Sequence, residues 1–262
     1  MTLLLLFLQE TVTIGGKTLD VSVLATRETR EFALWRADDD RPRKALLLRY
    51  PADRRPYLHT EGLERGYDLL FISSEGKIVD LQILPEGYSR GVTSAEPAAD
   101  VLALPRGTLR TLDADIGDAV TLPKTETIEP LDAVTFKDKD GVEHSVSVEL
   151  AYLWNDRGRG LMWRTALSED EGMLFKYPYE EAHSYWMRDT KIPLDLAFIR
   201  SDGTIRKIHR NMTPDTDKNH YPSDGNILYA LEVNAGWLEK HGINEGDVLT
   251  IPERVRKLKA GW

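Results

Sequence analysis

The chain contains no cysteine, which excludes disulfide bonds, thiol catalysis and zinc sites built on cysteine. Long apolar runs are also missing, since the longest, Leu3–Leu8, is far shorter than the roughly 20 residues that span a membrane. A surplus of basic residues is absent as well, because the formal net charge is −9. Nucleic-acid backbones attract basic surfaces. We therefore expect no nucleic-acid partner and no transmembrane segment.

The N-terminal apolar run also lacks the basic and small residues that flank the apolar core of a complete signal peptide. Two interpretations stay open. If the run is the remnant of a signal peptide, the protein is exported or periplasmic. If it is an ordinary N-terminal segment, the protein is cytoplasmic.

Several common catalytic signatures are missing too. No serine stands in a nucleophile elbow, and no glycine-rich loop has the spacing of a phosphate-binding motif. The acidic and histidine residues His183, Asp189 and Asp195 do not follow the spacing of a known zinc or calcium site. The sequence therefore predicts no cofactor and no metal site.

What the chain does contain is an internal repeat. Residues 47–78 align without a gap to residues 174–205, with ten identical pairs in 32 positions. Matched pairs outside this block include Trp35-Arg36 over Trp163-Arg164 and Gly117-Asp118 over Gly246-Asp247. We therefore predict two copies of one domain, at residues 11–123 and 131–254.

Each copy shows the pattern of short strands joined by tight turns. A hairpin is expected on either side of Gly76, and its counterpart around Gly203. In the second copy a polar loop is expected over residues 209–225, and short helices over residues 158–166 and 235–241. The predicted fold class is α+β, mainly β, with two tandem copies of a small, partly closed β-sheet domain that carries one or two short helices.

The second copy carries five ordered motifs: Arg159–Met162, Gly172–Phe175, Trp186–Thr190, Ile192–Asp195 and Leu231–Val233. This set resembles the bacterial and archaeal family called domain of unknown function 192. The family usually has Asn where this chain has Asp189, and Lys is common at the position of Arg188. The first copy resembles a degenerate relative. Many members of the family carry an export signal, so the resemblance implies a place in the cell envelope, and it implies no reaction.

Residues kept in both copies are candidates for holding the fold. Asp195 begins an apolar strand and has Asp68 as its counterpart, while Arg164 has Arg36. A buried carboxylate needs a cation or several hydrogen-bond donors. We therefore predict two structural ion pairs, Arg36–Asp68 and Arg164–Asp195.

Residues present only in the second copy are candidates for function. Arg159 aligns with Glu31, Glu232 with Ala103, and none of residues 186–190 is kept. An aromatic ring beside charged and hydroxyl groups suits a sugar or another small polar ligand. The candidate ligand-binding residues are Arg159, Trp186, Arg188, Asp189, Thr190 and Glu232.

Three functions stay open from the sequence. The first is a small polar ligand or carbohydrate binding module of the cell envelope, with binding by the second copy. The second is a hydrolase or carbohydrate-active enzyme that uses Asp189, Asp195 or Glu232 as acid or base. The third is a structural or protein-interaction module.

Overall fold

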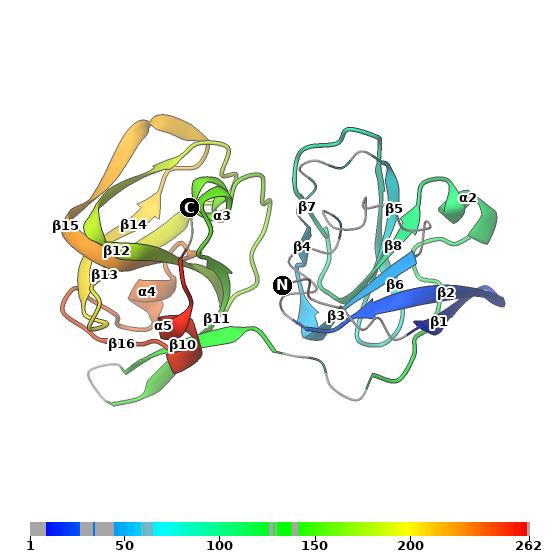
Figure 1. Cartoon of the computed structure of the whole chain (residues 1–262), viewed down its shortest axis with the longest axis horizontal. Coiled ribbons are helices and arrows are strands. Elements are labelled where there is room, and N and C mark those ends of the chain that lie inside the picture. Colours follow the sequence, from blue (N-terminus) through cyan, green and yellow to red (C-terminus); the bar gives the residue numbers. More distant parts are fainter. Residues whose placement is uncertain are drawn as a thin grey trace. The chain divides into compact units, whose positions relative to one another are not determined.

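The computed structural model describes residues 9–26, 34, 45–58, 60, 63, 65–125, 128, 130–137 and 141–260 (Figure 1). The chain divides into two compact units, Met1–Pro130 (unit 1) and Leu131–Trp262 (unit 2). Within the described residues, every helix is too short or too polar to cross a membrane.

Unit 1 consists of strands with one short described helix. Its elements are β1 (Gln9–Ile14), β2 (Lys17–Leu24), β3 (Ala45–Arg54), β4 (Tyr57–Leu58), β5 (Tyr67–Ile72), β6 (Ile78–Leu84), β7 (Val92–Thr93), β8 (Ala98–Pro105), α2 (Thr108–Leu112) and β9 (Val120–Thr121).

Unit 2 repeats this order with longer strands in its middle. Its elements are β10 (Asp132–Lys137), β11 (Glu143–Ala151), α3 (Trp154–Arg159), β12 (Glu171–Met187), β13 (Leu194–Ile199), β14 (Ile205–Met212), β15 (Thr216–Asn234), α4 (Trp237–Lys240), β16 (Leu249–Thr250) and α5 (Glu253–Lys257).

The two main sheets have the same topology. Unit 1 has the strand order β6-β5-β8-β3-β2-β1-β9, and unit 2 has β14-β13-β15-β12-β11-β10-β16. Each strand of one order therefore occupies the place of its counterpart in the other. The predicted tandem repeat of a mainly β domain is confirmed.

Each sheet closes partly on itself, because its two outermost strands meet at an isolated bridge, Lys77 with Ala119 and Thr204 with Val248. Gly203 lies at this closure with φ 94°, and a Cβ there would stand 2.4 Å from the carbonyl oxygen of Leu249. Gly76 has φ 74° at the equivalent point. Both glycines are kept because the closing strand passes where a side chain would be.

The polar segment 209–225 of unit 2 is mostly strand, so the predicted loop there is wrong. β14 continues to Met212 and β15 begins at Thr216. The partner that satisfies this backbone is the outer half of β12, as in the pair Tyr185 with Tyr221. In Figure 1, β12 and β15 run side by side as a long bent ribbon. The side chains of this segment are polar because the ribbon is exposed to solvent.

The helix expected over residues 158–166 lies earlier in the chain, as α3, and ends where Gly160 adopts φ 51°. The second expected helix, residues 235–241, is confirmed as α4.

The strands of unit 2 bury both faces. One face fills the interior of the partly closed sheet, where Leu174, Ala197 and Leu231 belong to one apolar cluster. The other face carries a second cluster that includes Phe175, Phe198 and Ala230 together with Leu161. Burial on both faces explains why β13 reads as a continuous apolar run apart from Asp195.

Asp195 is fully buried and binds backbone rather than arginine. Its two carboxylate oxygens accept N–H groups from Asn211 (2.8 Å), Gly236 (3.0 Å) and Leu238 (3.2 Å). Two of these donors lie at the start of α4, where N–H groups have no partner inside the helix. The carboxylate therefore fixes α4, whose Trp237 and Leu238 are buried in the interior cluster.

The predicted Arg164–Asp195 pair is therefore wrong. Arg164 is 1% exposed and instead forms two hydrogen bonds with the carboxylate of Glu149, at 2.9 and 2.5 Å. A buried carboxylate accepts either a cation or several hydrogen-bond donors, and the N–H groups at the start of a helix take the second role here.

Unit 1 uses the same arrangement, because Asp68 accepts the N–H of Leu109 (2.8 Å) in α2. The other member of the predicted Arg36–Asp68 pair, Arg36, lies outside the described residues.

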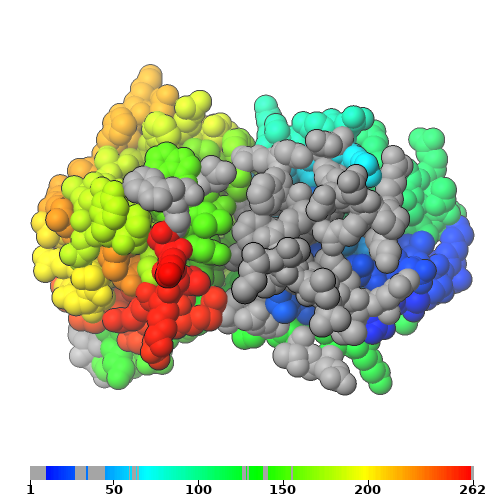
Figure 2. Space-filling model, in the orientation of Figure 1, coloured from blue at the N-terminus to red at the C-terminus, as the bar shows by residue number. Residues whose placement is uncertain are grey.

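A second buried contact holds the C-terminal helix of unit 2. The ammonium of Lys176, on β12, donates to the carbonyl oxygens of Val255, Arg256 and Leu258 at 2.5–2.9 Å. Figure 2 shows the C-terminal residues (red) as a compact patch on the surface of unit 2. Arg49, the counterpart of Lys176, likewise donates to the carbonyl of Pro123 (2.6 Å) after the last strand of unit 1.

Replacement of Asp195 by Ala tests the helix anchor. The change leaves three N–H donors without their charged acceptor, so we expect the free energy of unfolding to fall by roughly 3–5 kcal/mol. Urea denaturation measures it. The exposed Asp217→Ala variant is the control, with an expected change of no more than about 0.5 kcal/mol. Equal stabilities for the two variants would contradict the anchoring role.

Candidate functional site

The candidate residues at the end of β12 lie on the surface. Trp186 is 45% exposed, and the guanidinium carbon of Arg188 lies 5.8 Å from the centre of its ring. Arg188 also has an ion pair with Asp189, with 3.7 Å between Nε and Oδ2. These three residues form one exposed aromatic and charged group.

The other candidate residues are covered. Thr190 and Glu232 are both 5% exposed, and Arg159 has its guanidinium 3.9 Å from the carboxylate of Asp156. The backbone of Asp189 and Thr190 has a structural task, because the Asp189 carbonyl accepts the N–H of Trp163 at 2.8 Å. The six candidates are thus divided between the surface and the interior.

A pocket of about 310 Å³ lies between α3 and β12 of unit 2, and it contains none of the six candidates. Both elements supply aromatic and polar side chains to it. Its lining residues are Trp154, Arg157, Gly158, Tyr177, Pro178, Tyr179, Glu181 and His183.

Two rings in this pocket present free surface. Trp154 is 61% exposed and Tyr179 is 50% exposed. The ring of Tyr177 is already engaged, since His183 stacks on it with centres 3.5 Å apart and the Arg157 guanidinium lies 5.5 Å from its centre. A ligand therefore finds its apolar contact on Trp154 and Tyr179.

The position of His183 is set from behind by an irregular stretch of β15, Pro222–Gly225. The backbone N–H of His183 donates to the hydroxyl of Ser223, which is itself fully buried and donates to the Gly225 carbonyl. This stretch interrupts the pairing of β12 with β15.

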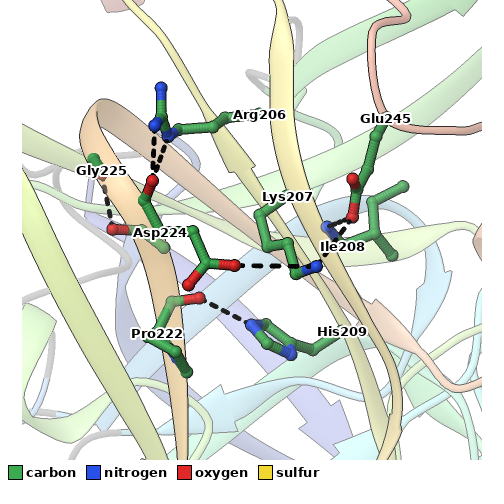
Figure 3. Close-up of polar contacts among 9 residues, drawn as sticks. Arg206, Lys207, Ile208, His209, Pro222, Asp224, Gly225 and Glu245 are labelled. Carbon is green, nitrogen blue, oxygen red and sulfur yellow. Dashed lines mark hydrogen bonds and ion pairs between the residues drawn. The ribbon is translucent and has the colours of Figure 1, made fainter.

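β14 holds the same stretch from its other side (Figure 3). Arg206 donates to the carbonyl oxygen of Asp224, and the His209 ring bonds the carbonyl of Pro222 through Nε2 at 2.7 Å. Lys207 has ion pairs with Asp224 (3.7 Å) and Glu245 (3.4 Å). Arg206, Lys207 and His209 of β14 therefore help to fix the stretch behind the pocket.

Charges inside the pocket offset one another. Arg157 supplies a cation and Glu181 an anion, while burial lowers the pKa of His183 below its usual value, with Arg157 acting in the same direction. Glu181, 3.5 Å from Nε2 of His183, acts in the opposite direction. At neutral pH His183 is uncharged, so the pocket has no strong net charge.

A buried polar group lies behind the pocket. The hydroxyl of Tyr177 bonds the hydroxyl of Tyr185 at 2.7 Å, and the Tyr185 ring packs edge-on against Phe175 and Phe198. Burial raises the pKa of Tyr177 to about 12 and raises that of Tyr185 as well. Both tyrosines lie within the electrostatic reach of Glu232.

Glu232 is a buried acid without a hydrogen bond to any residue that the structure describes. Burial raises its pKa to about 8, although the nearby Arg164 acts to lower it. Glu149, Met173 and Glu232 are neighbours in one row across β11, β12 and β15. Arg164 bonds Glu149 in this row, so Glu232 is left as the second, protonated carboxyl beside it.

Unit 1 lacks both acids of this row. Strand register places Ala103 where unit 2 has Glu232, and Ser22 where it has Glu149. The acids therefore belong to unit 2 and not to the shared fold. No group of three or more acidic or histidine side chains suited to hold a metal ion occurs among the residues that the structure describes.

Comparison of the two copies selected none of the residues that line the pocket. Tyr179, Glu181 and His183 are replaced in the first copy by Ala52, Arg54 and Pro56, which is the signal that was used to select Trp186. Tyr177 is kept as Tyr50, and a comparison that looks for function among residues present in one copy does not select it. Only the structure shows that Tyr177 both belongs to the buried cluster and lines the pocket.

Comparison with known proteins identifies a family that is described as uncharacterised. The family DUF192, described as "Uncharacterized ACR", matches residues 10–122 and again residues 135–251. No curated protein matches the chain.

Two solved structures are similar to part of it. One, presented as a candidate transcription regulator from Sinorhizobium meliloti 1021, is 37% identical, covers 46% of this chain and 92% of its own, and has a TM-score of 0.44. The other is a protein of unknown function from Novosphingobium aromaticivorans DSM 12444. It is 34% identical, covers 50% of this chain and 93% of its own, and has a TM-score of 0.43.

The protonation of Glu232 predicts a particular dependence of stability on pH. In the unfolded chain this carboxyl ionises near 4.5, and in the folded chain near 8. Between these values unfolding releases a proton, so stability falls as the pH rises through this window and levels off above it. A Glu232→Gln variant carries no such proton.

We expect the free energy of unfolding of Glu232→Gln, relative to the parent, to rise by about 4 kcal/mol between pH 5 and pH 8.5, since one pKa unit corresponds to about 1.4 kcal/mol. Urea denaturation at both pH values measures this. The exposed Glu239→Gln variant is the control and should follow the parent. A Glu232→Gln curve parallel to the parent at all pH values would show that the carboxyl is ionised in the folded state.

Proposed function

Since the chain belongs to the DUF192 family through both of its units, and that family carries no assigned activity, we propose a function from the geometry of unit 2. Unit 2 is a binding module for an uncharged, ring-shaped polar ligand such as a sugar, and the pocket between α3 and β12 is its site. The observation that carries this proposal is the pair of open rings, Trp154 and Tyr179, beside polar groups of opposite charge.

The chemistry of the pocket favours a sugar over a charged metabolite. An aromatic ring covers the apolar face of a sugar, and a few polar groups read its hydroxyls. Glu181 accepts hydrogen bonds, while Arg157, whose Nη1 donates to the carbonyls of Tyr152 and Lys176, supplies positive charge. Because these charges offset one another, a ligand with a strong charge gains little here.

This proposal keeps the function predicted from the sequence and moves its site. None of the six residues selected by comparing the copies lines the pocket. The cell envelope was inferred from the family resemblance and not from the site. We therefore retain it as the place where such a module would act.

An acid–base enzyme is the second candidate, and the raised pKa of Glu232 is what favours it. The other two acids considered for catalysis are less suited. Asp195 is committed to three backbone N–H groups, and Asp189 is paired with Arg188 on the surface. Glu232 does not line the pocket, so binding is the better supported function.

Two tryptophans provide a matched test of the site. Trp154 lies in the pocket, and Trp186 lies on the exposed ribbon outside it. We expect one or more of glucose, galactose, mannose, N-acetylglucosamine and cellobiose to bind the full chain, as measured by saturation-transfer NMR and titration calorimetry. Trp154→Ala should weaken this binding at least about tenfold, or about 1.4 kcal/mol, because the stacking surface is lost.

Trp186→Ala should bind like the parent protein. Glucuronic acid and glucosamine, which carry charges, should bind more weakly than the neutral sugars. If Trp186→Ala abolishes binding and Trp154→Ala does not, the site is on the ribbon. If none of the neutral sugars binds at millimolar concentration, the proposed ligand class is wrong.

A further inference from the structure

A glycine, Gly158, is among the residues that line the pocket. It lies within α3, four residues after Trp154, and it is exposed. Residues four apart are neighbours on one face of a helix. The exposed ring of Trp154 therefore has bare backbone beside it at the next turn of α3, on the side of the helix that faces the pocket.

The conformation and packing of α3 do not require a glycine at this position. The φ of Gly158 is not positive, and a Cβ built on it would meet no atom within 4 Å outside its chain neighbours and the backbone of its own helix. Gly160 is different, because its φ is 51° and a Cβ there would stand 3.1 Å from the ring of Phe175. The fold therefore explains Gly160 and does not explain Gly158.

A glycine within a helix is unfavourable unless something requires it. Glycine loses more backbone freedom on folding than alanine does. Helix α3 has six residues, and so short a helix depends on each of them. Proteins place glycine where the backbone must approach a ligand closely. The property that Gly158 provides here is the empty space beside Trp154.

We propose that Gly158 is a specificity-determining residue, whose missing side chain opens a recess beside Trp154 for the hydroxymethyl group of a hexose. The sugar ring stacks on Trp154, and the hydroxymethyl group extends over the backbone of α3. The recess has room for at least one carbon atom, because a Cβ fits there. This inference rests on the proposed function, since it assigns two parts of one ligand to two parts of the same pocket.

The long side chains on either side of this glycine are held elsewhere. The guanidinium of Arg157 lies 5.5 Å from the ring centre of Tyr177 and donates to the carbonyl oxygen of Lys176, both on β12. The guanidinium of Arg159 lies 3.9 Å from the carboxylate of Asp156. These contacts keep both arginines from turning into the recess.

Substitutions at position 158 test the recess in the full chain. Alanine and leucine favour helices, so the thermal unfolding midpoints of Gly158→Ala and Gly158→Leu should be no lower than that of the parent. Leucine fills the recess and covers part of the stacking surface. Titration calorimetry should therefore show the affinity for hexoses reduced by at least about tenfold in Gly158→Leu. Ser184→Leu, on the exposed ribbon outside the pocket, is the control and should bind like the parent.

Pairs of sugars test the hydroxymethyl group itself. Xylose, L-arabinose and lyxose correspond to glucose, galactose and mannose without this group. The parent should bind a hexose more tightly than its matching pentose. In Gly158→Ala the added methyl group occupies the recess, so the hexose should lose this advantage while the affinity for the pentose stays the same.

Equal affinities of the parent for a hexose and its pentose, or a preference that persists in Gly158→Ala, would overturn this proposal and leave the proposed function in place. A parent that binds none of the three hexoses would also overturn it. The proposed function falls as well only if N-acetylglucosamine and cellobiose likewise fail to bind.

Discussion

The fold of each unit depends on a buried aspartate that binds the first N–H groups of a short helix. In unit 2 this is Asp195, and in unit 1 it is Asp68. Helices of four or five residues are not stable alone. Attached to the carboxylate, α4 inserts Trp237 and Leu238 into the interior of the partly closed sheet. A charged group is thus kept inside an apolar strand because it organises the packing around it.

The two units share one face of the sheet and differ on the other. The interior face of the sheet is apolar in both units, and the closing glycines Gly76 and Gly203 are kept. The outer face differs. In unit 2 it carries Glu149 and Glu232 around Arg164, and in unit 1 Ser22 and Ala103 occupy the positions of the two acids. The shared architecture therefore leaves one face free to vary, and the pocket with its tyrosine pair lies on the side that varied.

Much of the fold was readable from the sequence, and the reason is the repeat. The two tandem copies, the hairpins and the importance of Asp195 all followed from comparing the copies. The partner of Asp195 did not, because backbone N–H groups leave no mark in a sequence. The place of Glu149 beside Arg164 depends on the parallel pairing of β11 with β12, which no local pattern specifies. Tyr177 was hidden for the opposite reason, since a residue that serves both the fold and the site is kept in both copies.

The contact of Lys176 with the last helix has a consequence for where unit 2 ends. Similarity to the family stops at residue 251, but the ammonium of Lys176 is satisfied by carbonyls as far as Leu258. A fragment cut at the limit of similarity would leave a buried cation without its oxygen ligands. The folded domain thus extends past the matched residues, because α5 is held by Lys176 and by the burial of Val255 in the interior cluster.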